Sequence, residues 1–459
     1  MPPLRPHLVP TLVLGLPLIG SHLARMAIGV IDTLMIGRYG VDALAALVLA
    51  TSVFLILVMG GGGYAIGLMG RIAAALSRDD HTDVRRATRM ALWLSGLHSA
   101  LTFPLLWGSG PILSALGQDP QIAGLAQDWL RVMGLAMPAV LGGMVLNSYL
   151  AALGRANLVL WVTLAGLPLN AALNWLLIFG PGPFPAWGVY GAALASLAVN
   201  WLQLLALALY ASWLPQARRF ALFTRFWRPD WPAFREILWL GLPIGLTLVA
   251  EIGMFTGANL MMGWFGPDPL AAHGIALQIA SLTFMVHLGL SNAATIRVGA
   301  AQGRGDGPGL SAAAAAATLL STGFAVLTMG VFVLWPEWLT GLYLDADNPR
   351  APGIVALAAA LMIYAGAFQV VDALQAMALG LLRGVQDTRV PMALGVVSYW
   401  IIGLPAGYLL AFPLGMGPAG LWAGLVIGLT AAAVLLMTRF WRRGAAWVAV
   451  GTAPARAGA

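Results

Sequence analysis

The chain has 459 residues, of which 60% are hydrophobic and only 9% charged, and its mean hydropathy is +0.85. This composition excludes a cytosolic enzyme, a secreted disulfide scaffold and a disordered chain. Cysteine is absent, which excludes disulfides, thiolate catalysis and cysteine-ligated metals. The net charge of +7 comes from 24 arginines and no lysine, and they are too dispersed to form the basic stripe that nucleic acid requires.

Apolar segments of about 20 residues or more follow one another along the whole chain, which is typical of repeated membrane-spanning helices. The first is too long for a signal-peptide core and lacks a cleavage site, so we interpret it as a span. Twelve spans are predicted, at 10–37, 43–70, 88–108, 125–148, 157–180, 188–213, 236–264, 270–297, 310–335, 352–382, 391–412 and 417–441.

The arginines alternate between the breaks that separate these segments. One set of alternate breaks, with the carboxy-terminal end, holds Arg71, Arg78, Arg85, Arg86, Arg89, Arg155, Arg218, Arg219, Arg225, Arg228, Arg235, Arg297, Arg304, Arg383, Arg389, Arg439, Arg442 and Arg443. The other set holds little more than Arg38, Arg131 and Arg350. Because arginine is retained on the cytoplasmic side, both termini are predicted to be cytoplasmic.

The sequence repeats itself with one constant shift. This shift superimposes Leu-Gly-Leu-Pro at 14–17 on the same letters at 240–243, and it pairs Asp42 with Asp268 and Arg71 with Arg297. Each half has an even number of spans, so the two repeats are parallel and related by an axis along the membrane normal. We predict an all-α membrane protein with four parts: a six-helix lobe at 1–214, a cytoplasmic linker at 215–235, a second six-helix lobe at 236–445 and a cytoplasmic tail at 446–459.

Three carboxylates lie inside predicted spans, where a charge costs about 2.5 to 3.5 kcal/mol on insertion scales. Asp32 belongs to the outer half of the first span, whereas Glu251 and Asp372 lie deep in the seventh and tenth spans. If Glu251 and Asp372 approach each other, repulsion and desolvation favour uptake of a proton or Na⁺, which is the physics of a coupling-ion site. The alternative is that these carboxylates only bridge helices.

A second polar group is predicted in the first half. Asn170 and Asn174 share one face of the fifth span, and Asn174 reaches about the height of Asp32. Arg25 lies two turns from Asp32 on the same face, and the repeat superimposes it on Glu251. We interpret Arg25 as a modulator that neutralises Asp32 or repels cationic cargo, or else as an arginine that bridges helices.

Other motifs restrict the function further. No Walker, Gly-x-Ser-x-Gly or Rossmann motif is present, so ATP is excluded as an energy source within this chain and an enzyme is disfavoured. Histidines lack metal-ligand spacing, and no cofactor or metal is expected beyond a transported Na⁺. The glycines at 60–63 predict a close approach of helices. Proline recurs in Gly-Leu-Pro, as at Pro17 and Pro243, where helices can bend.

Several motifs follow one another along the chain. The first is the run at 30–38 with Asp32, followed by Leu-Ala-Ala at 44–46. The others are 271–273 continuing to 296–299, Gly-Arg at 154–155 with the two Leu-Asn pairs of the fifth span, and 382–384 with 387–390. Together these motifs resemble the multidrug and toxic compound extrusion (MATE) family, and most closely its bacterial NorM branch. The resemblance covers nearly the whole chain.

The resemblance implies a monomeric, V-shaped pair of lobes in the bacterial inner membrane, which exports cationic or amphipathic small molecules in exchange for inward Na⁺ or H⁺. It implies that Glu251 and Asp372 form the cation site of the second lobe, and that Asp32, Asn170 and Asn174 form that of the first. This sequence departs from the family pattern at Arg25, where an uncharged polar residue is expected, and at Gly274, where glutamine is usual.

Two functions are therefore carried forward, both in contact with membrane lipids and neither with nucleic acid. The first is ion-coupled antiport of organic cations. The second is a lipid-linked precursor or polysaccharide flippase of the same superfamily, which should place several arginines inside spans, whereas Arg25 alone is predicted there. A passive channel is disfavoured, because carboxylates in separate halves do not form a ring.

Overall fold

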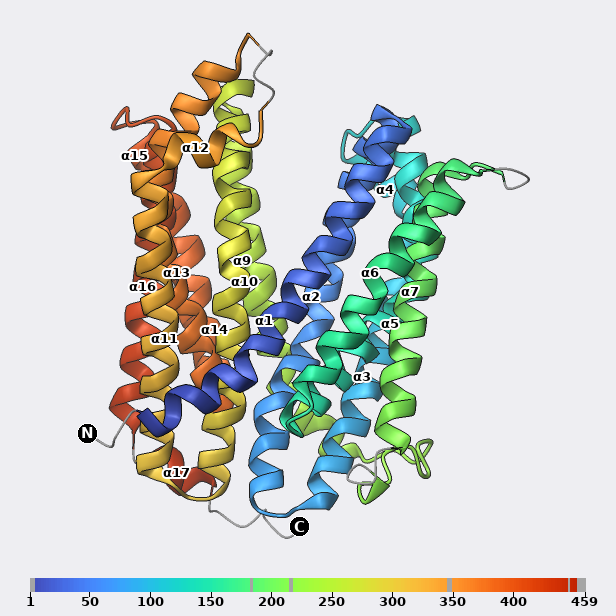
Figure 1. The fold of residues 1–459 in the computed structure, drawn as a ribbon, viewed down its shortest axis with the longest axis vertical. Coiled ribbons are helices and arrows are strands. Elements are labelled where there is room, and N and C mark those ends of the chain that lie inside the picture. The colour runs from blue at the N-terminus through green and yellow to red at the C-terminus, as the bar shows by residue number, and fades with distance from the viewer. Residues whose placement is uncertain (1–4, 182–184, 214–217, 345–348, 445, 452–459) are drawn as a thin grey trace. The chain divides into compact units, whose positions relative to one another are not determined.

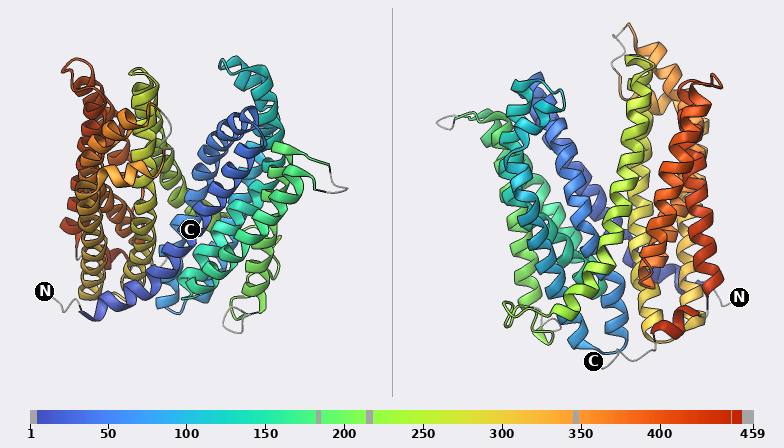
Figure 2. Two further views of the ribbon diagram at one scale, coloured as in Figure 1. Left: turned by 45° about the horizontal axis from the view of Figure 1, so that its top comes forward. Right: turned by 180° about the vertical axis from the view of Figure 1, so that it is seen from behind.

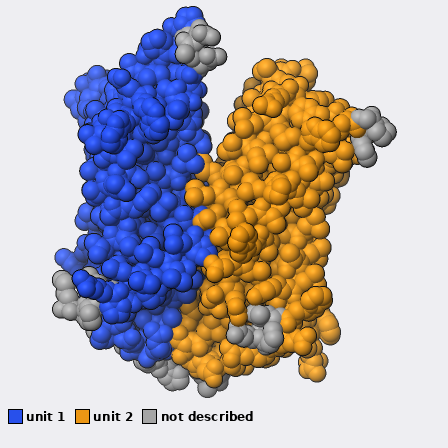
Figure 3. Space-filling model, viewed as in Figure 1, with its two compact units in different colours: residues 1–19, 246–459 blue, residues 20–245 orange. Residues whose placement is uncertain are grey.

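A computed structural model describes residues 5–181, 185–213, 218–344, 349–444 and 446–451. Within these residues all regular secondary structure is helical, and twelve helices are long and apolar enough to cross a membrane, as predicted. The chain forms two compact units: unit 1 contains residues 1–19 and 246–459, and unit 2 contains residues 20–245 (Figure 3). The predicted linker and tail are described only in part, since 215–217 and 452–459 lie outside the described residues.

The first repeat begins with α1 and ends with α7 (Figure 1). Two short helices lie between long ones and are not long enough to cross a membrane: α4 in the first repeat and α12 in the second. The helices of the first repeat are α1 (Arg5–Tyr39), α2 (Val41–Ser77), α3 (His81–Trp107), α4 (Ser109–Ala115), α5 (Pro120–Ala152), α6 (Ala156–Phe179) and α7 (Gly188–Trp213).

The second repeat begins with α9, and in unit 1 its helix α13 packs against both α10 and α16 (Figures 1 and 2). Its helices are α9 (Trp231–Gly263), α10 (Pro267–Gly303), α11 (Gly307–Leu334), α12 (Pro336–Gly341), α13 (Ala351–Gly384), α14 (Arg389–Val396), the π-helix η1 (Val397–Gly403), α15 (Leu404–Ala411), α16 (Pro418–Arg443) and α17 (Ala446–Gly451).

The helix bounds repeat as the sequence does. The shift that superimposes the two halves of the sequence carries both ends of α2 onto the ends of α10. The next helices, α3 and α11, are capped by Asp80 and Asp306, whose carboxylates accept from the backbone N–H three residues later. One span departs from the repeat. Where the first repeat has the continuous helix α6, the second has α14, η1 and α15, and π-helical turns of this kind are frequent at functional sites.

The first helix of each repeat is divided between the two units. Helix α1 is in unit 1 up to Ile19 and in unit 2 thereafter, whereas α9 is in unit 2 up to Gly245 and in unit 1 thereafter. Both divisions fall two residues after the proline of a Gly-Leu-Pro motif, Pro17 or Pro243. Proline lacks the N–H that closes a helical turn, so in each helix the boundary between the units lies next to a missing backbone hydrogen bond. The compact units thus differ from the two sequence repeats by an exchange of half-helices.

Glycines bring helices together inside each unit. In unit 2 a Cβ on Gly63 of α2 would lie 2.2 Å from the carbonyl oxygen of Gly241 and 2.4 Å from the nitrogen of Gly245, both on α9. The close approach predicted from the glycines at 60–63 is therefore present. In unit 1 a Cβ on Gly424 of α16 would lie 2.1 Å from the Cα of Gly407 on α15. Only glycine permits such contact between helix backbones.

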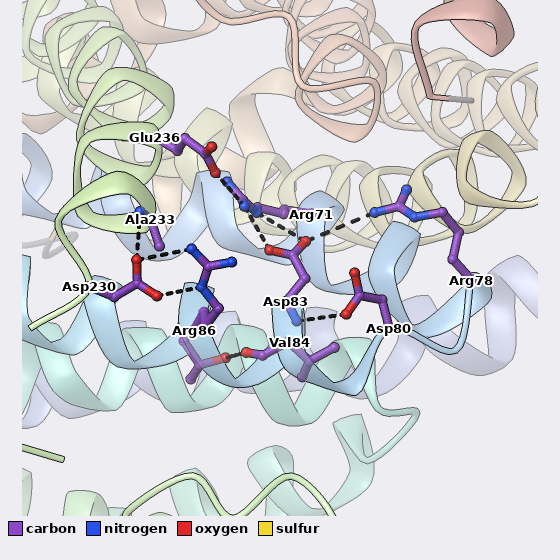
Figure 4. Close-up of polar contacts among 10 residues, drawn as sticks. Arg71, Arg78, Asp80, Asp83, Val84, Arg86, Asp230, Ala233 and Glu236 are labelled. Atoms are coloured by element: carbon purple, nitrogen blue, oxygen red, sulfur yellow. Dashed lines mark hydrogen bonds and ion pairs between the residues drawn. The ribbon is translucent and has the colours of Figure 1, made fainter. Parts of the chain in front are cut away.

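An ion-pair network attaches the first part of α9 to α2 and α3 within unit 2 (Figure 4). Arg71 binds Asp83 at 2.7 Å and Glu236 at 2.6 Å, and Arg86 binds Asp230. The hydrogen bonds from Arg86 hold the pKa of the Asp230 carboxyl, which precedes α9, below its ordinary value. The network keeps residues 231–245 with the helices of the first repeat.

The helices are longer than the apolar segments, which corrects part of the loop assignment. The sequence predicts Arg71, Arg297 and Arg383 in breaks between spans, but they lie inside α2, α10 and α13. Arg71 and Arg383 are largely buried. Hydropathy excludes these arginines from the spans, whereas helix bonds and ion partners allow the helices to continue through them.

Candidate functional site

The predicted polar cluster of the first lobe is assembled in unit 2 from three helices. Asn174 of α6 donates from Nδ2 to Oδ1 of Asp32 on α1 at 2.5 Å and to Oδ1 of Asn170 at 3.2 Å. Ser196 of α7 donates to the other carboxylate oxygen of Asp32 at 3.2 Å. Both asparagines are fully buried, whereas Asp32 is half-buried. The three residues predicted from the sequence are thus in mutual contact.

The cluster presents oxygen atoms to a cation. Asp32 supplies a carboxylate, and among the described residues Oδ1 of Asn174 has no hydrogen-bond partner. Carboxylate and amide oxygens are the ligands that hard cations take, and a carboxylate also accepts a proton. The cluster therefore has the donor set for Na⁺ or H⁺, and its fixed donors, Asn174 and Ser196, stabilise the ionised carboxylate when neither is bound.

Arg25 does not pair with Asp32. The hydrogen bonds to Asp32 come from Asn174 and Ser196, and Arg25 is exposed on unit 2, where it borders a small cavity with Asn147 and Gln203. The predicted neutralisation of Asp32 by Arg25 is therefore not realised as an ion pair. Arg25 instead presents a guanidinium beside polar amides.

The carboxylates of the second lobe both lie in unit 1. Glu251 lies on α9 after the point where this helix passes from unit 2 to unit 1, and Asp372 lies on α13 with only 3% of its surface exposed. Helix η1 contacts both of these helices. Trp400 donates from Nε1 to the backbone carbonyl of Ala250, next to Glu251, at 3.0 Å, and Gln375 of α13 donates to the hydroxyl of Tyr399. The two predicted carboxylates therefore lie on helices that both contact the π-helix that breaks the repeat.

A buried arginine completes this group. Arg383 is 6% exposed, and its guanidinium interacts electrostatically with Glu251 and Tyr399. Two carboxylates and one guanidinium leave one negative charge in excess when all are ionised. Among the described residues Oδ1 of Asp372 and Oε1 of Gln375 have no hydrogen-bond partner. Because buried charges and unpaired oxygens are costly, uptake of one monovalent cation or proton stabilises the group.

Sequence reasoning missed four residues of these two clusters: Ser196, Gln375, Arg383 and Tyr399. Ser196 and Gln375 are single polar residues in apolar helices, and only their neighbours across the bundle distinguish them from ordinary helix polar groups. Arg383 has a signal in the sequence, but as part of a loop motif. Tyr399 has none, because its position depends on the π-helical turns of η1.

Among the described residues no group of three or more His, Asp or Glu side chains is placed to hold a metal ion. Of the buried histidines, His287 lies 2.9 Å through Nδ1 from the hydroxyl of Ser321, and His273 lies edge-on to the ring of Trp422. The carboxylates of the two clusters are thus the groups considered for cation binding.

The family model described as MatE matches residues 17–176 and again residues 243–409. The chain belongs to the MATE family. The two matched segments begin at Pro17 and Pro243, which the repeat of the sequence superimposes on each other. The chain is thus a member of a transporter family and not an enzyme.

Two curated relatives have the same name, which describes them as multidrug resistance proteins. The chain is 47% identical over 436 residues to "Probable multidrug resistance protein NorM" of Rhizobium meliloti (strain 1021), covering 95% of this chain and 93% of the relative. It is 41% identical over 434 residues to the protein of the same name from Agrobacterium fabrum (strain C58), with the same coverage of both chains. The resemblance to the bacterial NorM branch is therefore confirmed.

Solved structures share the fold. The crystal structure of the eukaryotic MATE transporter AtDTX14 superimposes with a TM-score of 0.85 at 20% identity, covering 97% of this chain and 98% of that one. A crystal structure of MATE in complex with MaL6 gives a TM-score of 0.87 at 22% identity, over 95% and 96% of the two chains. The predicted all-α MATE-type bundle of two six-helix repeats is confirmed.

Proposed function

We propose that the protein is a secondary active exporter of cationic and amphipathic small molecules, driven by inward movement of Na⁺ or H⁺. The observation that carries the proposal is the pair of carboxylate clusters inside an otherwise apolar transporter bundle, one in each unit. The family and the relatives named as multidrug resistance proteins support the cargo class. The protein needs no cofactor besides the coupling ion.

Glu251 and Asp372 form the coupling site of unit 1 in this proposal. Without a cation, their repulsion is offset only in part by Arg383, so the group takes up Na⁺ or H⁺ from the side to which it is open. Occupation removes the excess charge from a low-dielectric interior and favours the conformation in which the group is closed to water. Release on the other side restores the repulsion and allows the cycle to repeat.

Asp32, Asn170 and Asn174 form the coupling site of unit 2. Its carboxylate is more exposed than that of Asp372 and is held by two neutral donors, so an organic cation competes there with the coupling ion for one negative charge. Competition of this kind makes exchange obligatory, because cargo and coupling ion cannot share Asp32. Arg25 adds a fixed positive charge that favours departure of a cation from this unit.

The arginine distribution supports placement in the bacterial inner membrane with both termini cytoplasmic. We propose that the protein works there as a monomer among membrane lipids, since each carboxylate cluster is built from helices of a single unit.

The experiment is export of a fluorescent organic cation from proteoliposomes, energised separately by a Na⁺ gradient and by a pH gradient. Wild type should export under one of them, and Glu251→Gln should not. Glu337→Gln is the matched control, because Glu337 is exposed in the first turn of α12, away from the cluster. Undiminished export by Glu251→Gln would overturn the proposed coupling site.

A flippase for lipid-linked precursors is the second candidate, and the exposed guanidinium of Arg25 favours it. Phosphate head groups are bound by arginine. The buried position of Arg383 beside Glu251 speaks against a second arginine for such a ligand. The same proteoliposomes test it, because translocation of an anionic lipid-linked substrate that is lost in Arg25→Gln, without any cation export, would support the flippase.

A further inference from the structure

A cavity of about 370 Å³ opens in unit 2, where α1 ends and α2 and α7 begin. It is separate from the Asp32 cluster, none of whose residues lines it. Its polar and aromatic lining comes from Tyr39, Asp42, Asp128, Trp187 and Tyr190. The arginine distribution predicts that this end of the unit faces outward. A volume of this size is enough for a small organic molecule.

The aromatic side chains of the cavity have other rings beside them. The rings of Trp187 and Tyr190 are 6.4 Å apart in an edge-on arrangement, and the ring of Tyr39 lies 6.4 Å from that of Phe179. Gly188 between them has a φ of +52°, and a Cβ there would lie 2.5 Å from the Tyr39 ring, so no side chain can fill the space. The faces of aromatic rings attract organic cations.

The charge of the cavity is negative, because two aspartates and no cationic side chain line it. Asp42 is exposed in the first turn of α2, and the described residues give it no ion pair. Asp128 has only a 4.0 Å contact with Arg131, its neighbour on α5. The two carboxylates therefore make the cavity attractive to a positive group.

The other repeat supplies an internal comparison. Asp268, which corresponds to Asp42, forms an ion pair with Arg350, the residue that precedes α13. Helix α5 is preceded instead by Asp119, whose carboxylate caps the helix by accepting from two backbone N–H groups. Unit 1 thus pairs its Asp268 with an arginine, whereas Asp42 of unit 2 has no ion pair among the described residues.

We propose that this cavity is a second binding site for organic ammonium compounds, with the ammonium group between Asp42 and Asp128 and the apolar body against Tyr39, Trp187 and Tyr190. The site goes beyond the proposed exchange cycle, because binding there needs no ion gradient and no conformational change. The site allows the outer end of the protein to bind a cation independently of Asp32.

The test is a titration of the whole protein in lipid nanodiscs with benzyltrimethylammonium, followed by saturation-transfer NMR, which detects weak binding. The double variant Asp42→Asn with Asp128→Asn should weaken binding about fivefold to tenfold, as loss of two partly exposed charge contacts does. The matched control is Asp268→Asn, the same change at the corresponding position of the other repeat, and it should leave the dissociation constant unchanged. Neopentylbenzene, a neutral molecule of the same shape, measures partition into lipid.

The site would be overturned by equal binding of the double variant and wild type, or by an equal loss in Asp268→Asn. Loss of binding in Asp32→Asn would also overturn it, because it would assign the ligand to the cluster already described. If the double variant fails to fold, Trp187→Leu tests the same cavity through its aromatic wall, and unchanged binding there contradicts the proposal. Binding with these properties in a protein that exports nothing would contradict the proposed function and leave this site supported.

Discussion

Substitution of Gly63 by alanine tests whether direct backbone contact holds the first part of α9 in unit 2. The added Cβ would lie 2.2 Å from the carbonyl oxygen of Gly241 and 2.4 Å from the nitrogen of Gly245. Ordinary contact requires about 1 Å more. Both neighbours are backbone atoms of one helix, so neither can rotate away, and α2 and α9 must separate. Overpacking costs about 1 to 3 kcal/mol, and we expect the upper end of that range here.

The assay is thermal unfolding followed by intrinsic fluorescence, since the chain has 18 tryptophans and no cysteine for a thiol dye. Gly63→Ala should lower the apparent Tm. Gly96→Ala is the matched control: Gly96 lies within α3 with nothing within 4 Å of its added Cβ, so it should gain up to about 1 kcal/mol of helix propensity. An apparent Tm of Gly63→Ala equal to or above that of Gly96→Ala would refute the packing argument.

Three further predictions concern polar contacts. Asn174→Ala should slow gradient-driven export about tenfold, because a hydrogen bond to the charged Asp32 contributes about 1.5 kcal/mol, and an unchanged export rate would contradict this. Asp230→Asn should lower the apparent Tm at neutral pH. Since Arg86 depresses the pKa of Asp230, this difference should shrink as the pH falls below about 4, and a difference that grows on acidification would be inconsistent with the ion pair. Arg383→Gln should reduce the yield of folded protein by leaving the half-buried carboxylate of Glu251 without its cation, which size-exclusion chromatography would show.

Much of the architecture is predictable because a membrane simplifies the problem. Spans must be apolar and helical, so hydropathy locates all twelve. The repeat is visible because Pro17, Asp42 and Arg71 all have counterparts at one constant spacing in the second half. The exchange of half-helices is not predictable. It depends on Gly63 packing against Gly241, a contact between residues that the linear repeat assigns to different halves.

The candidate sites are predictable where charge is expensive. Asp32, Glu251 and Asp372 are identified because a carboxylate in a span needs a reason. The spacing of Asn170 and Asn174 on one helix predicts that they share a face. Contacts between helices cannot be predicted from such spacing. Spacing alone also suggests that the arginine two turns before Asp32 approaches it, whereas that side chain extends toward other polar groups.

Burial of Arg383 is missed for a related reason. Hydropathy places an arginine near a helix end in the loop by default, and only its acidic neighbour on another helix accounts for a position inside the bundle. Tyr399 is missed because α-helical periodicity does not describe the π-helix on which it lies.

The most direct test of the account measures ion entry and cargo exit together in one proteoliposome preparation. Addition of an organic cation to the side from which it is exported should start a counterflow of Na⁺ or H⁺ in wild type and in Asp79→Asn, an exposed matched control whose left-handed backbone tolerates asparagine. Asp372→Asn should abolish both flows at an unchanged apparent Tm. Cargo export by Asp372→Asn without ion counterflow, or counterflow at the wild-type rate, would contradict the claim that the buried carboxylates couple the two movements.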